Sequence, residues 1–70
     1  MTDKTIRQSV VDALEFDPSI DAAGIGVAVH DGVVTLSGHV PTYLQKSSAE
    51  GVAMRVKGVK AGAEEIEVRP

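Results

Sequence analysis

The fold is decided by residues 25–40, IGVAVHDGVVTLSGHV, in which two runs of alternating apolar residues flank an Asp-Gly dipeptide. Asp31-Gly32 suits a two-residue type I′ turn, because both of its central positions need a positive φ. Such a turn pairs His30 with Val33, and a slip of one residue would move every large apolar side chain off the shared face. Residues 25–40 therefore predict an antiparallel hairpin with one apolar face. The predicted pairs are His30–Val33, Val29–Val34, Val27–Leu36 and Ile25–Gly38.

The segment before the hairpin, residues 3–15, carries apolar residues at the spacing of one helical face. Asp3 can cap the beginning of this helix by accepting hydrogen bonds from free backbone N–H groups. Pro18 disfavours helical geometry at Asp17 and so ends the helix. Phe16 and Ile20 follow, and we expect both to fill the seam between helix and sheet. The apolar face consists of Ile6, Val10, Ala13 and Leu14.

A second helix is predicted over residues 43–57. Thr42 and Gln45 match the capping-box pattern, in which the threonine caps the first turn and the glutamine reaches back to it. Gly58 can take the left-handed conformation that closes the helix, and Val59 can then fold back over the last turn. The predicted buried stripe is Ala49, Val52, Ala53 and Val56, with Leu44 one turn earlier as a further core residue.

Residues 61–69 alternate again, with Ile66 and Val68 on the core face and Glu64 beside them. A carboxylate there is tolerable only if it is exposed at an edge or paired with a cation. Each strand has one strongly apolar side, so both helices must cover the same face, and the crossover into the third strand should be right-handed. The predicted fold class is α+β, in the order α-β-β-α-β, with two helices on one face of a three-stranded mixed sheet. The sequence leaves open whether the third strand lies beside the second or the first.

With these elements in place, the sequence resembles the BON domain, a small bacterial module named after osmotically inducible and nodulation proteins. Residues 31–40, DGVVTLSGHV, are similar to the family's DGVVTLSG followed by one residue and valine. Gly62 stands where the family usually has a larger aliphatic residue, and Glu64 where it often has asparagine. We therefore expect the third strand to be looser or bent at its beginning. Further similarity, spread over nearly the whole chain, lies at Ala13-Leu14, Asp17-Pro18, Lys57-Gly58-Val59 and Ile66-Glu67-Val68.

The resemblance implies a single non-enzymatic binding domain over residues 1–70. It also implies phospholipid or membrane-surface binding in osmotic or envelope stress. Many relatives are periplasmic proteins or lipoproteins, often with two or three such domains. The sequence is similar to the first domain of signal-less proteins that join several BON domains. Met1 to Lys4 lack the basic and then apolar pattern of a signal peptide. We expect a cytoplasmic domain if Met1 is the native start, and a periplasmic one if the chain belongs to a longer precursor.

Composition excludes several kinds of chemistry. The 70 residues include no cysteine, which rules out disulfides, zinc–cysteine clusters and thiol nucleophiles, and the net charge of −3 is opposite to a nucleic-acid-binding footprint. His30 and His39 face strand positions about six residues apart, roughly 20 Å along a strand, so they cannot share a metal ion. Ser37 lies close to His39 along one strand, but the chain has no G-x-S-x-G elbow. We expect no enzyme activity, no metal, no cofactor and no small-molecule substrate.

Two surfaces remain as candidate binding sites. The first is a basic surface around the second helix, which would attract an anionic phospholipid surface; the alternative is an ordinary solvated helix face. The second is the helix-free face of the sheet, which is small and flat and suits a partner protein or a sister domain; the alternative is the wet face that antiparallel sheets commonly have. The basic surface comprises Lys46, Arg55, Lys57 and Lys60, with Tyr43 at the helix start; the sheet face comprises Ala28, Val33, Thr35 and Ser37.

Overall fold

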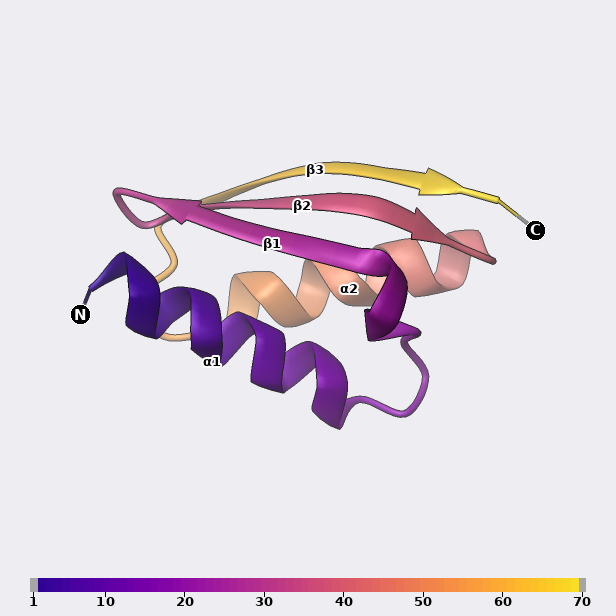
Figure 1. Ribbon diagram of the computed structural model, residues 1–70, viewed down its shortest axis with the longest axis horizontal. Helices are drawn as coiled ribbons and strands as arrows, with labels where there is room; N and C mark the ends of the chain where they lie inside the picture. Colours follow the sequence, from indigo (N-terminus) through magenta and orange to yellow (C-terminus); the bar gives the residue numbers. More distant parts are fainter. Residues whose placement is uncertain (1, 70) are drawn as a thin grey trace.

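A computed structural model describes residues 2–69 (Figure 1). The chain order is α-β-β-α-β with one short 3₁₀ turn, and the α+β fold class is confirmed. The sheet forms one layer, and both helices cover the same face of it (Figure 1). The elements are α1 (Asp3–Phe16), η1 (Ala22–Gly24), β1 (Ile25–His30), β2 (Val33–Val40), α2 (Tyr43–Arg55) and β3 (Ala61–Val68).

The hairpin of β1 and β2 has the predicted register in every pair, from His30↔Val33 to Ile25↔Gly38. Its turn residues Asp31 and Gly32 have φ values of 50° and 80°, as a type I′ turn requires. The sheet order is β1-β2-β3, and β3 runs parallel to β2. The structure thus settles the position of the third strand, which lies beside β2.

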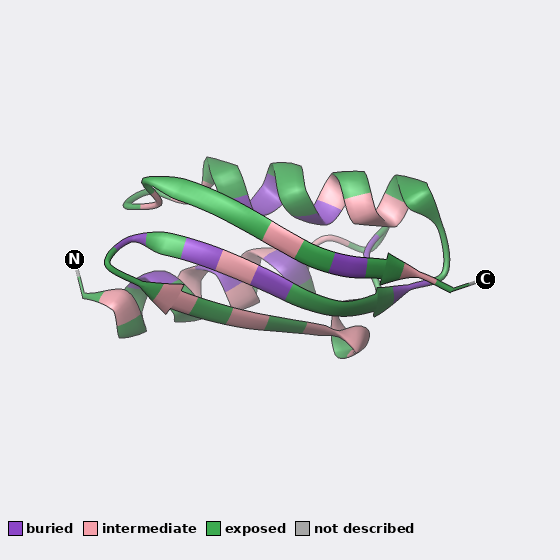
Figure 2. Cartoon of the chain, turned by 90° about the horizontal axis from the view of Figure 1, so that it is seen from above, coloured by how far each residue is buried: buried purple, intermediate pink, exposed green. Residues whose placement is uncertain are grey.

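The core lies between the sheet and the two helices. Along β2 the alternation is visible as buried and exposed bands (Figure 2). Ile20 is buried as predicted, at the point where the chain passes from α1 to the sheet. The buried apolar residues are Ile6, Val10, Leu14, Ile20, Val34, Leu36, Val40, Ala49, Val52, Ala53 and Ile66.

Two expectations about α1 are wrong. Thr2, rather than Asp3, caps the helix: its hydroxyl accepts a hydrogen bond from the backbone N–H of Thr5 at 3.2 Å. Phe16 does not fill the seam, since it is 89% exposed. Phe16 follows Leu14 by two residues, which is about 200° around a helix, so it points away from the buried stripe.

Helix α2 is capped by Thr42 as predicted, because its hydroxyl accepts from the backbone N–H of Gln45 at 3.2 Å. The side chain of Gln45 does not reach back to its own cap; instead its oxygen accepts from the backbone N–H of Asp21 at 2.8 Å. The helix ends at Arg55, earlier than predicted, because Val56 has an extended conformation. Leu44 was expected in the core, which is wrong, since it is 75% exposed.

Strand β3 is neither loose nor bent in its pairing, since all of Ala61–Val68 pairs with β2. A Cβ on Gly62 would lie 2.6 Å from the Met54 sulfur, so Met54 of α2 fills the space that a larger residue at position 62 would need. Glu64 is paired, as the sequence required, with the Lys46 ammonium at 3.7 Å. Both departures from the BON pattern thus have partners on α2.

Candidate functional site

The two histidines do not form a site. His30 and His39 lie near opposite ends of the open sheet face, and the acidic group beside His30 is that of its neighbour Asp31, at 3.4 Å. Residues 2–69 contain no group of three histidines or carboxylates that could hold a metal ion. The structure also places Ser37 and His39 two residues apart on β2, with exposed side chains. This face therefore offers no preorganised metal ligands and no nucleophile–base pair.

The basic residues proposed for lipid binding are spread over several sides of the molecule. Lys46 is half-buried beside Glu64, and its ammonium lies 5.8 Å from the centre of the Tyr43 ring. Arg55 follows Lys46 by nine residues, which is two and a half helical turns, so the two point to opposite sides of α2. Lys46 faces β3, whereas Arg55 faces α1.

Lys60 belongs to the hairpin end of the molecule. Its backbone N–H donates to the carbonyl of Gly32 at 2.8 Å, and its aliphatic stem covers this glycine. Lys57 is exposed just beyond α2. Of the proposed basic set, Arg55 and Lys57 are therefore the two that follow each other closely at one end of α2.

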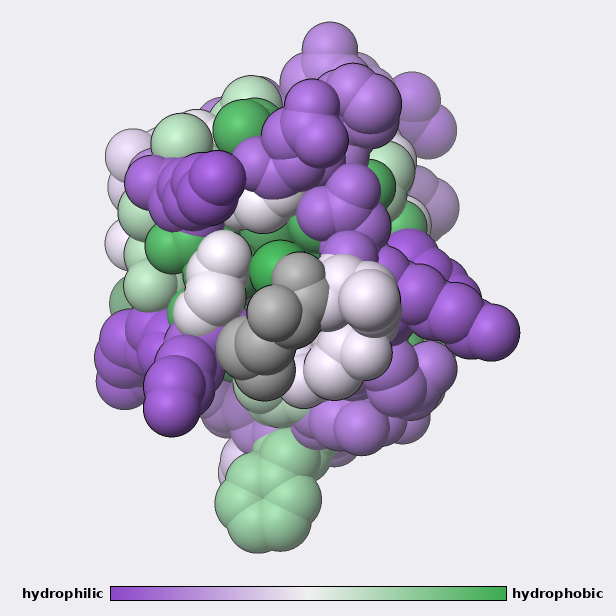
Figure 3. Space-filling view, turned by 90° about the vertical axis from the view of Figure 1, so that its left-hand side faces the viewer, coloured by the Kyte–Doolittle hydropathy of each residue, from purple (hydrophilic) through white to green (hydrophobic). Residues whose placement is uncertain are grey.

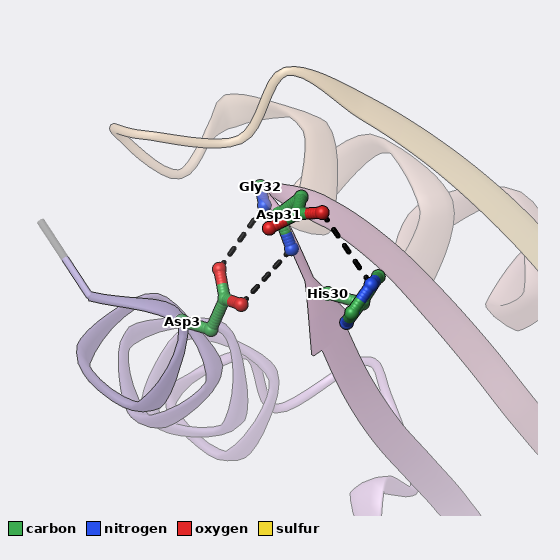
Figure 4. Close-up of polar contacts among 4 residues, drawn as sticks. All are labelled: Asp3, His30, Asp31 and Gly32. Carbon is green, nitrogen blue, oxygen red and sulfur yellow. Dashed lines mark hydrogen bonds and ion pairs between the residues drawn. The ribbon is translucent and has the colours of Figure 1, made fainter.

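The hairpin end contains a polar cluster that the sequence did not indicate (Figure 4). The Asp3 carboxylate accepts hydrogen bonds from the backbone N–H groups of Asp31 at 2.9 Å and Gly32 at 3.1 Å. These two bonds, with smaller contributions from His30 and Lys60, lower the pKa of Asp3 below its ordinary value. Seen from this end, the molecule is mostly hydrophilic (Figure 3). Asp3 therefore fastens the beginning of α1 to the turn between β1 and β2.

This contact predicts a pH-dependent contribution to folding. Because the pKa of Asp3 is lower in the folded chain, its contribution is complete above its ordinary pKa and is lost as the pH falls through the folded value. We expect Asp3→Ala to melt at a lower temperature than the wild type at about pH 7, and the gap to narrow towards about pH 2. Circular dichroism melting curves at both pH values measure this.

Asp3→Asn is the matched control, since it keeps the size of the side chain and loses its titration. The difference between its melting temperature and that of the wild type should also become smaller as the pH is lowered. A gap of equal size at both pH values would show that the ionised carboxylate is not what holds the turn.

A shallow, mostly apolar groove lies between the C-terminal halves of α1 and α2, with a volume of about 650 Å³. Phe16 stands at its rim almost fully exposed. Asp17 also borders it, and hydrogen bonds from the hydroxyl and the backbone N–H of Ser19, at 2.7 and 2.9 Å, lower the pKa of Asp17, with Arg55 contributing less. The lining residues are Asp12, Ala13, Phe16, Asp17, Pro18, Val52, Arg55 and Val56.

A second exposed apolar residue lies on the same side of the helix layer. Leu44, Gly51 and Arg55 are seven and four residues apart, so they share one side of α2, the side that borders the groove. The sequence contains the signal for both exposed residues, because neither Phe16 nor Leu44 fits the buried stripe of its helix. The groove with these two side chains is the strongest candidate site on the helix layer.

The open sheet face places its proposed residues together. Ala28 lies opposite Thr35, and Thr35 lies opposite Ala63 of β3, so small side chains form a row across all three strands. Val33 lies one step nearer the turn and is 40% exposed, whereas Ser37 has Glu65 beside it on β3. The side chains of this face are thus small and uncharged near the turn between β1 and β2, and acidic towards its other end.

Comparison with known protein families decides what kind of domain this is. The family model for the BON domain matches residues 2–70. The chain is a BON domain. No curated protein matches it. BON domains form a non-catalytic family of binding-type modules, so this BON domain is a binding module in that broad sense.

The structure explains why the family motif has a glycine at position 38. Gly38, the glycine of DGVVTLSG, has a φ of 117°, and its backbone touches that of Gly24 so closely that a Cβ would lie 2.0 Å from the Gly24 carbonyl oxygen. The glycine lets the chain that enters β1 lie directly against the backbone of β2. None of the helices in residues 2–69 is long and apolar enough to cross a membrane.

Proposed function

We propose that this BON domain binds the surface of anionic phospholipid membranes through the outer side of its helix layer. The observation that carries the proposal is a pair of large, exposed apolar side chains on the helix layer. Phe16 is 89% exposed at the rim of the groove, and Leu44 is 75% exposed at the other end of α2, on the same side of that helix as Arg55. A residue of this kind that stays in water in the folded chain is stabilised by entering the interface of a bilayer. Osmotic or envelope stress is the setting that the family resemblance suggests.

The energies involved indicate weak, salt-sensitive binding by one domain. Full burial of an aromatic or leucine side chain is worth about 1.5–3 kcal/mol. A basic residue near an anionic surface adds about 1 kcal/mol, which Arg55 and Lys57 can supply. Asp12 and Asp17 border the same groove and oppose anionic headgroups, although Arg55 lies near Asp17. Insertion of Phe16 is therefore expected to matter more than net charge.

The test is co-sedimentation with anionic and neutral phosphatidylcholine-based vesicles, at low and at physiological salt. We expect binding to the anionic vesicles, weakened by salt, and a loss of roughly tenfold in affinity for Phe16→Ser, since about 1.4 kcal/mol corresponds to a factor of ten. Because Phe16 is exposed, this substitution should leave the melting temperature nearly unchanged.

Val33→Ser is the matched control, since Val33 is an exposed apolar residue on the opposite, open face of the sheet. It should bind vesicles as the wild type does. Equal binding by the Phe16→Ser variant and the wild type would rule out insertion of the helix layer. Loss of binding in Val33→Ser would instead move the lipid site to the sheet.

A second candidate function is packing against a sister domain or partner protein through the open sheet face. The row of small side chains at Ala28, Thr35 and Ala63 favours it, because a flat face allows close approach of another surface. A domain that works in this way would lose its partner when Ala28 and Thr35 are both replaced by arginine. Its vesicle binding would stay the same, which separates the two functions.

A further inference from the structure

The sheet has two outer strands with very different edges. β3 carries Glu64, Glu65 and Glu67, whereas β1 contains no charged residue and no proline from Ile25 to Val29. In Figure 2, β1 is the lowest strand, and η1 is the element that lies at its outer side, near its beginning. Charged residues and proline are the usual devices that keep an edge strand from pairing. The edge of β1 lacks both, so we propose that two copies of this chain pair through their β1 strands and form one continuous six-stranded sheet.

The register of the hairpin fixes which backbone groups of β1 point outwards. The residues that flank a two-residue turn, His30 and Val33, form a hydrogen-bonded pair, and such pairs alternate along an antiparallel ladder. Val29 and Val27 therefore direct their N–H and C=O groups away from β2. The N–H of Ile25 is taken by the carbonyl of Ala22, which leaves the Ile25 carbonyl free.

These free groups are self-complementary about a two-fold axis at Val27. In an antiparallel pair, Val27 of each copy can exchange hydrogen bonds with Val27 of the other, and Val29 can donate to the carbonyl of Ile25. Directly opposite residues of an antiparallel pair lie on the same face of the sheet. The half-buried side chains of Ile25, Val27 and Val29 would thus extend the apolar layer of one copy into that of the other.

Helix α1 is complementary to itself about the same axis. Val11 and Glu15 border a small pocket with Ile25 and Val27, which places Val11 near the level of Val27. Arg7 precedes Val11 by four residues and Glu15 follows it by four, so all three share one side of the helix. A two-fold axis at this level brings Arg7 of one copy towards Glu15 of the other, twice.

Arg7 and Glu15 are available to pair with a second copy. Within residues 2–69, neither Arg7 nor Glu15 has an ion-pair partner. Glu15 also lies in the last turn of α1, which has no basic residue, so it faces the negative end of the helix dipole. A cation from the second copy would relieve that repulsion. One short strand and one helix side form a small interface, so we expect a weak dimer that needs high protein concentration.

Sedimentation equilibrium of the 70-residue chain, from micromolar to millimolar concentration, tests the dimer without any lipid. The wild type should dimerise, and Arg7→Glu or Glu15→Arg should each raise the dissociation constant roughly tenfold, because each turns two attractive contacts into repulsive ones. The double variant Arg7→Glu with Glu15→Arg should restore dimerisation. Glu15→Arg places a cation at the end of α1, which favours the helix, so its effect cannot come from unfolding.

Spin labels give the register directly, because the chain has no cysteine and one can be introduced at will. With the axis at Val27, the two Cα atoms at position 28 lie about 8 Å apart, as diagonal neighbours across two strands. Nitroxides on Ala28→Cys should therefore show strong dipolar coupling, and those on Ser47→Cys, which is exposed on α2, should not. A wild-type chain that stays monomeric at millimolar concentration would overturn the proposal. So would a double variant that fails to recover dimerisation, or equal coupling at both labelled positions.

Discussion

Replacing Gly38 with alanine is expected to destabilise this domain by about 3–5 kcal/mol, because two separate costs add up. The φ of 117° at this position is a conformation that L-residues rarely adopt. The new methyl group would also lie 2.0 Å from the carbonyl oxygen of Gly24 and 3.3 Å from the Cα of Ile25. Both contacts are with backbone, so no side-chain rotation relieves them, and the beginning of β1 must move.

Urea unfolding followed by far-ultraviolet circular dichroism measures this loss. Small domains have little stability to spare, so a change of this size should leave a large fraction of the variant unfolded in buffer. Gly51→Ala is a control of opposite sign. Gly51 lies within α2, and a Cβ there meets nothing within 4 Å. It should therefore stabilise the domain by about 0.5–1 kcal/mol. A nearly neutral Gly38→Ala would show that the backbone of Gly24 does not lie this close to Gly38.

The hairpin could be predicted residue by residue because its constraints are local. A two-residue turn leaves a single register, and the apolar alternation of both strands agrees with it. The capping role of Thr42 was equally readable, since a cap depends on residues within one turn. The need of Glu64 for a partner was clear as well, but not which residue would supply it. Lys46 can do so only because α2 lies over β3.

The features that the sequence did not reveal depend on how distant elements meet. Aspartate is a common helix-capping residue, yet the carboxylate of Asp3 binds the hairpin turn instead. It can do so because α1 begins beside Asp31 and Gly32, which are 28 and 29 positions away in the sequence. The position of β3 was open because no local pattern in residues 61–69 indicates which strand they pair with. Gln45 likewise matched a capping box and instead bonds to the backbone of Asp21, 24 residues before it.

The candidate site shows the same division. A count of lysines and arginines suggests one basic surface, but helix geometry places Lys46 and Arg55 on opposite sides of α2. The apolar side chains of Phe16 and Leu44 were predicted to be buried, and both are exposed. Angular position on the helix decides this, since Phe16 and Leu44 lie off the stripes formed by Leu14 and Val52. Their exposure is what turns the helix layer into a candidate membrane surface.

Leu36→Ala is expected to cost about 2–5 kcal/mol, the usual range for removing a buried leucine side chain. Leu36 is 2% exposed on the central strand, opposite Val27 of β1 and Glu64 of β3, and it lies beside α2. The size of the cavity left behind determines where in this range the value falls. Urea unfolding should show a lower midpoint with an unchanged slope, because the surface exposed on unfolding stays nearly the same.

Ser37→Ala is the matched control, since Ser37 is the next residue along β2 and is exposed on the opposite face. Its substitution should change the stability by no more than about 0.5 kcal/mol. The contrast between these neighbours tests the register itself, because a shift of one residue would exchange their faces. If alanine at position 37 were the costlier change, the hairpin would be out of register by one residue.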